Sequence, residues 1–178
     1  MLSDNWKLAQ KNVATFLNEH NFAIQEEVRL LNEKRMDILA LKKVGKRFYH
    51  IIVEVKDWNS VSRKKEMEFC QQIISYLIQY SLEKILPKNP KNKWERRKIK
   101  INDQFIGILC LTKDAHFSYR KVSDHYFLKN TRMQGIPLRE QIAKSIHLYV
   151  ARFDFLPKVF QELQIPLYKE PRLLDCLE

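Results

Sequence analysis

Three charged residues stand at the ends of two apolar stretches, in a pattern that can bind a metal ion. Asp37 opens one stretch, and Glu54-Val55-Lys56 closes the next. Because alternate side chains of a strand share a face, Glu54 and Lys56 point the same way, about 7 Å apart along the backbone. A hairpin would bring Asp37 beside them. Burying charged side chains without a partner is costly, and a metal ion is one such partner.

The predicted ligand is a hard cation. Two carboxylates favour Mg²⁺, with Mn²⁺ as a substitute, and the backbone carbonyl of Val55 is a further predicted ligand beside Asp37 and Glu54. The metal would lower the pKa of a bound water, and Lys56 would position that water or stabilise the transition-state phosphate. This is the chemistry of phosphodiester hydrolysis. The alternative is a surface ion pair at a strand end.

The periodicity of the apolar residues predicts the elements that position these groups. An amphipathic helix is predicted from Ser3 to about residue 20. Three strands joined by short turns follow, and short turns make them antiparallel. Their predicted ranges are 22–31, 36–41 and 48–55, with 42–46 as the second turn. By parity, His50 shares the face of Glu54 and Lys56 and is a minor candidate for the site.

The second half of the chain begins with a predicted helix over 61–86 that ends before Pro87. A basic segment over 87–103 follows, and then a buried strand over 105–112. Further helices are predicted over 122–129, 138–153 and 157–163. Together these elements predict one α/β or α+β domain with a small mixed sheet flanked by helices, in the order αβββαβ plus C-terminal helices. Residues 1–112 would form the core, and 113–178 a helical extension packed on the same domain.

This order, with the acid on the second strand and ExK on the third, resembles the PD-(D/E)xK nuclease superfamily and its restriction-endonuclease-like fold, over roughly residues 3–112. The resemblance implies that Asp37 and Glu54 are metal ligands and that Lys56 is the catalytic lysine. Gln72-Ile73-Ile74-Ser75-Tyr76 is similar to the QxxxY motif of the lambda-exonuclease and RecB-type branch. That similarity implies that Gln72 lies near the active site, supported by Tyr76 one turn away. Gln71 is the neighbouring alternative.

The sequence departs from the family in two places. Met36 precedes the acid where the family pattern has Pro, and Gln10 stands where many members carry a metal-binding Glu in the opening helix. Glu19, Glu26 and Glu27 are the alternatives for that extra ligand. A single well-occupied metal site is therefore predicted, with Gln10 and Glu27 as supporting residues.

The charge balance predicts a polyanionic partner. The chain of 178 residues has 32 Lys plus Arg against 21 Asp plus Glu, a net charge of +11. Such positive charge attracts phosphates and releases their counterions, so DNA is the predicted partner, with RNA as an alternative. The basic segment has an aromatic residue that could stack on a base or sugar. Its predicted nucleic-acid-binding residues are Lys93, Trp94, Arg96, Arg97 and Lys98.

Other classes of protein are disfavoured. The three glycines are too scattered for a phosphate-binding loop or a dinucleotide turn, and the three cysteines are too far apart for a disulfide framework or a zinc site. No secretory leader and no stretch of about 20 apolar residues is present, so we expect a cytoplasmic protein without a membrane partner.

The resulting hypothesis is a Mg²⁺-dependent endonuclease acting on DNA. A homodimer is expected because two sites most simply cut both strands, and a partner protein is an expected source of specificity. The alternative is a non-catalytic nucleic-acid-binding or assembly subunit on the same fold, which would keep the basic surface and bind no metal.

Overall fold

The computed structural model describes residues 3–85, 103–113, 117–122 and 146–167. These residues form an α+β fold in which three α-helices cover a mixed six-stranded sheet. The helices are α1 (Ser3–Glu19), α2 (Arg63–Ile85) and α5 (Leu156–Glu162), and a 3-10 turn, η1 (Phe153–Phe155), precedes α5. The strands are β1 (Ala23–Arg29), β2 (Arg35–Val44), β3 (Arg47–Lys56), β4 (Asp103–Leu111), β5 (Tyr119–Lys121) and β6 (Ile146–Arg152).

The sheet has the strand order β1-β2-β3-β4-β6-β5. The first three strands form the predicted antiparallel meander, whereas β3, β4 and β6 run parallel and β5 is antiparallel to β6. The predicted mixed sheet and the predicted order up to β4 are confirmed in the described residues. The carboxyl ends of the three parallel strands meet at one edge of the sheet, which is where α/β proteins commonly bind ligands.

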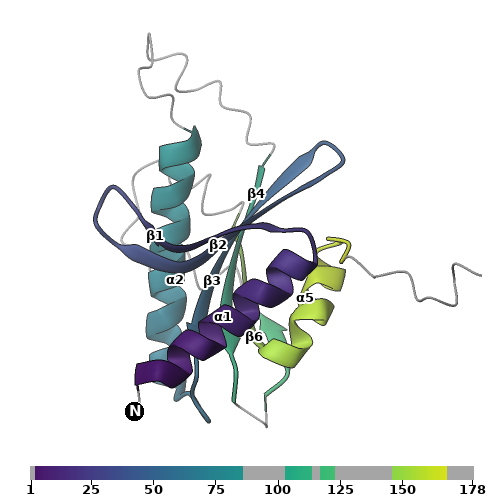
Figure 1. Ribbon diagram of the computed structural model, residues 1–178. Helices are drawn as coiled ribbons and strands as arrows, with labels where there is room; N and C mark the ends of the chain where they lie inside the picture. The colour runs from purple at the N-terminus through teal and green to yellow at the C-terminus, as the bar shows by residue number, and fades with distance from the viewer. Residues whose placement is uncertain (1–2, 86–102, 114–116, 123–145, 168–178) are drawn as a thin grey trace, which may run out of the picture.

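Helices cover both faces of the sheet. In Figure 1, α1 and α5 lie on one face and α2 on the other. On α1, Ala9, Val13 and Leu17 are buried at a spacing of four residues, as expected for a helix with one apolar stripe. Strand β3 contributes to both cores, with odd-numbered residues facing α1 and α5 and even-numbered residues facing α2. This explains why β3 is apolar almost throughout.

Two glycines stand at positions where packing or backbone conformation favours glycine over other residues. A Cβ on Gly107 of β4 would come within 2.5 Å of the Ile73 side chain, so this glycine lets α2 pack closely on the sheet. Gly45, with a φ of +60°, begins a two-residue turn between β2 and β3. The prediction of a turn over 42–46 is wrong at its start, because β2 continues to Val44.

The predicted helix over 138–153 is also wrong over its described part, because residues 146–152 form β6 between β4 and β5. A strand buried on both faces is an almost continuous apolar run, and such a run has no period that separates it from a buried helix. The short edge strand β5 was not predicted. The predicted final helix is confirmed as α5, and the predicted helix over 122–129 lies outside the described residues apart from Val122, which is not helical.

The part of the chain beyond residue 113, which was predicted to be a helical extension, contributes strands to the same sheet. Strands β5 and β6 add to the sheet that the N-terminal residues begin, so the described part of the extension is not purely helical. No helix within the described segments is long and apolar enough to cross a membrane.

Candidate active site

The predicted acidic residues meet where β2 and β3 stop pairing through their backbones. The ladder between these strands extends to Ile38 opposite Val53. Beyond it, side chains bridge the strands: the Val55 N–H donates to Asp37 Oδ2 at 2.9 Å, and the Asp37 N–H donates to Glu54 Oε1 at 3.3 Å. The prediction that a hairpin brings Asp37 beside Glu54 is therefore confirmed, and backbone donors hold both carboxyl groups in place.

Glu54 is the most perturbed group of this cluster. Its side chain is 3% exposed and faces α2. Burial, followed by the negative charge of Asp37, raises the pKa of Glu54 to about 8, although Lys56 opposes the shift. The raised pKa favours the protonated form of Glu54 at neutral pH, and a bound cation would relieve the repulsion that contributes to this shift.

Lys56 lies at the opening of the cluster. Its Nζ is 3.7 Å from Glu54 Oε2 and 4.8 Å from the centroid of the Phe69 ring. The side chain is 22% exposed, so the ammonium group reaches solvent while its stem is packed. A phosphate that approached Asp37 from solvent would meet this ammonium group.

Helix α2 brings the predicted Gln72 and Tyr76 to the same place. Tyr76 is buried, and the Gln72 Nε2 donates a hydrogen bond to its hydroxyl. Burial raises the pKa of Tyr76 and this hydrogen bond lowers it, while the charges of Glu54 and Asp37 raise it further. The Tyr76 hydroxyl thus lies within the electrostatic field of the two carboxylates. Gln72 itself is exposed, and it contacts the site through Tyr76.

The predicted supporting residue Gln10 lies behind Asp37. It is buried, and its Nε2 donates to Glu27 Oε1 at 3.2 Å and to the Asp37 carbonyl at 3.4 Å, with Glu26 Oε1 at 3.5 Å. Glu27 has a φ of 57°, and this left-handed conformation interrupts the β1 ladder and turns two successive carboxylates toward one amide. Arg35 Nε pairs with Glu27 Oε2 at 2.7 Å.

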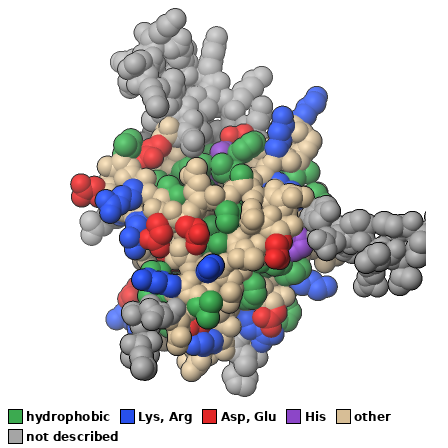
Figure 2. Space-filling model, viewed as in Figure 1, with side chains coloured by type: hydrophobic (Ala, Val, Ile, Leu, Met, Phe, Trp, Pro, Cys, Tyr) green, Lys and Arg blue, Asp and Glu red, His purple; other side chains and the backbone are tan. Residues whose placement is uncertain are grey.

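The alternatives for an extra metal ligand do not join the Asp37–Glu54 pair. Glu26 and Glu27 approach the main chain of Asp37 through Gln10, and Glu19 lies about two and a half turns further along α1 than Gln10. Figure 2 shows acidic and basic side chains next to one another over β1 and the adjoining part of α1. In the described residues this second acidic group is thus compensated by Gln10 and Arg35.

The donor set of the main pair fits Mg²⁺. The described residues contain no group of three or more His, Cys, Asp or Glu side chains arranged to hold a metal. Asp37 and Glu54 supply two carboxylates, and the Val55 carbonyl faces the same side of β3 as its N–H, which bonds to Asp37. Mg²⁺ usually takes one or two carboxylates and keeps several waters, so a small oxygen set of this kind suits it.

A solvent-accessible hollow of about 520 Å³ lies beside the acidic pair and reaches Asp37, whereas the buried Glu54 does not line it. Its lining includes Asp37, Val55 and Lys56, together with two residues at the start of α1, Asn5 and Trp6. The remaining lining residues are Arg35, Asp57, Trp58 and Lys113. Arg35 and Lys113 in this lining are paired with Glu27 and Asp57, so Lys56 is the lining cation that lies beside the acidic pair.

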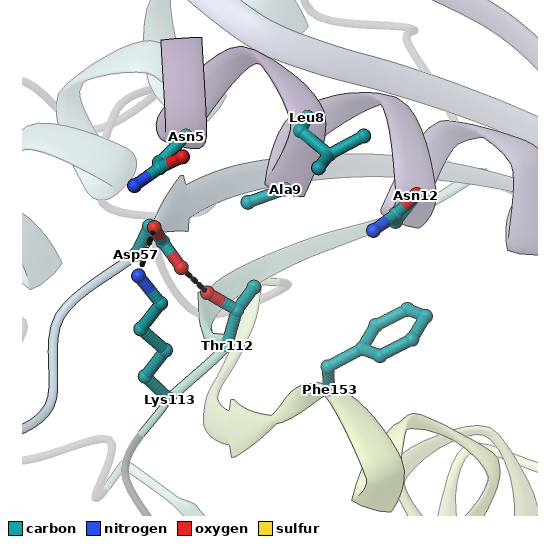
Figure 3. Close-up of a pocket in the computed structure, with 8 residues that line it drawn as sticks. All are labelled: Asn5, Leu8, Ala9, Asn12, Asp57, Thr112, Lys113 and Phe153. Carbon is teal, nitrogen blue, oxygen red and sulfur yellow. Dashed lines mark hydrogen bonds and ion pairs between the residues drawn. The ribbon is translucent and has the colours of Figure 1, made fainter. Parts of the chain in front are cut away.

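Sequence reasoning missed the residues that follow β3 and β4. Asp57 Oδ2 pairs with Lys113 Nζ at 2.7 Å, and Asp57 Oδ1 accepts a hydrogen bond from Thr112 Oγ1 at 2.6 Å, as Figure 3 shows. Burial acts to raise the pKa of Asp57, but the bonds from Lys113 and Thr112 outweigh it and lower the pKa. The signal was available in part, because residues that follow neighbouring parallel strands meet at one edge of the sheet.

The predicted nucleic-acid-binding residues Lys93, Trp94, Arg96, Arg97 and Lys98 lie outside the described residues. His50 lies on the predicted face, but its contacts are with Tyr80 and Asp103 at the other end of β3. Comparison of the chain with protein-family models, with curated proteins and with solved structures finds no match.

Proposed function

We propose that this protein is a Mg²⁺-dependent endonuclease of restriction-endonuclease-like fold that hydrolyses phosphodiester bonds in DNA. The observation that carries the proposal is the pair of carboxyl groups of Asp37 and Glu54, bridged by backbone donors at the end of two strands, with Lys56 3.7 Å from Glu54. Burying Glu54 against a second carboxylate is unfavourable for folding unless a cation neutralises the pair, so this arrangement indicates a functional reason.

Each of these residues has a distinct role in the proposed hydrolysis. In this proposal Asp37, Glu54 and the Val55 carbonyl would hold Mg²⁺, which would lower the pKa of a bound water and neutralise charge on the phosphate. The Lys56 ammonium group orients the attacking water or stabilises the charge that develops on the phosphoryl oxygens. Tyr76, held by Gln72, fixes the inner wall of the site against Glu54.

The resemblance of the sequence to PD-(D/E)xK nucleases supports the same function. The described elements follow the order that the family would require up to β4, with Asp37 on β2 and Glu54 on β3. The net charge of +11 favours a nucleic acid as substrate. DNA is the proposed substrate and RNA is the alternative. A homodimer would place two sites on one duplex, and a partner protein would add specificity.

The rival function is a non-catalytic nucleic-acid-binding or assembly subunit on the same fold. Such a subunit would use the positive surface equally well. It has no need of a buried Glu54 placed beside a second carboxylate and a lysine, and this arrangement favours the nuclease.

The test is cleavage of a supercoiled plasmid, a labelled single-stranded DNA and a labelled RNA, each with Mg²⁺, Mn²⁺ or EDTA. Wild-type protein is expected to cut in the presence of metal only, and Asp37→Asn is expected to lower the rate by at least about a hundredfold. Asp103→Asn is the matched control, because Asp103 is a partly exposed carboxylate at the other end of the sheet. Cutting that persists in Asp37→Asn, or metal-free binding without any cutting, would reject the nuclease.

A further inference from the structure

A second hollow adjoins the one that holds Asp37 and Lys56. It has a volume of about 320 Å³ and lies between α1, the ends of β3 and β4, and the turn η1 after β6. The two hollows share Asn5, Asp57 and Lys113. A nucleic-acid strand whose phosphate reached Asp37 would therefore have its neighbouring nucleotide at the entrance of the second hollow.

The charges in this second hollow cancel. Lys113 is the only Lys or Arg among its described lining residues, and it is paired at 2.7 Å with Asp57, the only carboxylate there. The other Asp57 oxygen is occupied by Thr112. A phosphate would find no uncompensated cation in this space, whereas a neutral ligand would not have to break the pair.

The remaining walls suit a flat, polar ring. Asn5, Leu8, Ala9 and Asn12 recur at helical spacing on one side of α1, and Figure 3 shows them above the hollow with the Phe153 ring opposite. Among the described residues, the Asn5 and Asn12 side chains form no hydrogen bond, so both amides are available as donors and acceptors. Asparagine amides pair with base edges, and aromatic rings stack on bases.

The Phe153 ring is fixed in place before any ligand arrives. It packs edge-on against Phe16 of α1, with 5.7 Å between ring centroids and 76° between ring planes. Ligand pockets usually span roughly 300–1,000 Å³, so a hollow of about 320 Å³ is large enough for a small ligand such as one base.

We infer that this hollow binds an unpaired nucleobase of the strand whose neighbouring phosphate lies at Asp37 and Lys56. The inference rests on the proposed function and names its substrate class, a strand that is single or locally unpaired at the cleavage site. Asn5 and Asn12 contact the base edge, Phe153 supports its face, and Asp57 with Lys113 separates the base from the reacting phosphate.

Binding without metal tests this inference separately from catalysis. The probe is a short fluorescent single-stranded DNA in EDTA, compared by anisotropy with versions that carry one abasic site at each position in turn. For wild-type protein, one abasic position is expected to weaken binding about tenfold. Asn12→Ala is expected to remove most of that difference. Asn18→Ala is the matched control, because Asn18 is also exposed on α1 but does not line the hollow.

A second variant guards against an indirect effect of the first. Phe153→Leu keeps an apolar side chain and is expected to reduce the abasic penalty, with an unchanged thermal unfolding midpoint as the check on its fold. Equal binding of all abasic probes, or equal behaviour of Asn12→Ala and Asn18→Ala, would overturn the inference. If plasmid and single strands are still cut in that case, the nuclease stands without the base site. A clear abasic penalty in a protein that never cuts would support the base site and reject the nuclease.

Discussion

The two ends of β3 each carry a buried polar group on the face toward α2, and the two groups have very different neighbours. His50 and Glu54 are four residues apart, about 13 Å along the strand. His50 Nδ1 lies 2.7 Å from the Tyr80 hydroxyl and Nε2 lies 2.9 Å from Asp103 Oδ2. The His50 ring also stacks on Phe105 at 5.0 Å, with 13° between the planes.

Glu54 has a less favourable set of neighbours. Its carboxyl group faces a second carboxylate, that of Asp37, and its one cation is 3.7 Å away. A buried polar group whose partners match its hydrogen-bonding capacity rigidifies a fold, whereas one that is pressed against a like charge costs stability and is kept for another reason. The comparison therefore assigns the His50 end to structure and the Glu54 end to function.

The largest effect should come from the lysine at the functional end. Lys56→Met keeps much of the side-chain length but removes the ammonium group, which lies beside Glu54 and over the Phe69 ring. We expect single-turnover cleavage to fall by about a hundredfold or more, because a developing phosphoryl charge loses its nearest protein cation. The protein should remain folded by circular dichroism. A Lys56→Met protein that cuts at the wild-type rate would remove Lys56 from the mechanism.

At the structural end, the expected loss is in stability. His50→Ala removes the stacked ring and leaves the buried Tyr80 hydroxyl without its nitrogen partner. We expect the free energy of unfolding in urea to fall by about 3 kcal/mol, from the cavity and the unsatisfied hydroxyl together. Cleavage per folded molecule, measured well below the unfolding midpoint, should stay within about twofold of wild type. A large loss of cleavage in the folded protein would contradict the division between the two ends.

Glu54 should also make stability depend on pH. Its pKa is raised from 4.5 to about 8 on folding, so between these pH values the folded chain holds a proton that the unfolded chain has lost. This contribution is complete at pH values below 4.5 and is lost as the pH rises through 8. In EDTA, wild-type protein should therefore lose roughly 2–4 kcal/mol of stability from this group between pH 5 and about pH 9.

Glu54→Gln separates this effect from other titrations. Glutamine cannot ionise, so the variant should lose this pH dependence of stability. Above about pH 8 it should unfold at a higher temperature than wild type. Scanning calorimetry at several pH values measures the difference. Saturating Mg²⁺ should raise the unfolding temperature of wild type only, since the cation replaces the proton on Glu54. If the unfolding temperatures of the two proteins changed with pH in the same way, the carboxyl pair would not be strained.

The sequence predicted the elements whose signals are local. Three of these signals can each be found within one segment: the apolar stripe of α1, the short turns between β1, β2 and β3, and the helical periodicity of the apolar residues in α2. Together these elements place Asp37 beside Glu54. Strand β6 could not be distinguished from a helix, because its residues are buried on both faces and carry no period. Its place between β4 and β5 depends on contacts that are distant in sequence.

The neighbours of the site were missed for the same reason. The bond between Asp57 and Thr112 joins residues 55 positions apart, and it exists only because β3 and β4 are parallel and in register. The contribution of Asn5 likewise depends on how α1 crosses the sheet. Residue types predicted that Asp37, Glu54 and Lys56 belong together, whereas the surrounding walls required the tertiary structure.

The smallest predicted effect compares two tyrosines one turn apart on α2, each serving one end of β3. The Tyr76 hydroxyl faces the carboxyl pair and accepts from Gln72, whereas the Tyr80 hydroxyl bonds to His50. Tyr76→Phe should slow single-turnover cleavage about fivefold with little change in unfolding free energy, because the wall beside Glu54 loses the hydroxyl that Gln72 holds. Tyr80→Phe should do the reverse and cost about 1 kcal/mol of stability without changing the cleavage rate. Both substitutions remove the same atom from the same helix. If Tyr76→Phe affects only cleavage and Tyr80→Phe affects only stability, the difference must come from the end of β3 that each tyrosine contacts. Equal effects of the two substitutions in both assays would show that α2 does not distinguish the two ends.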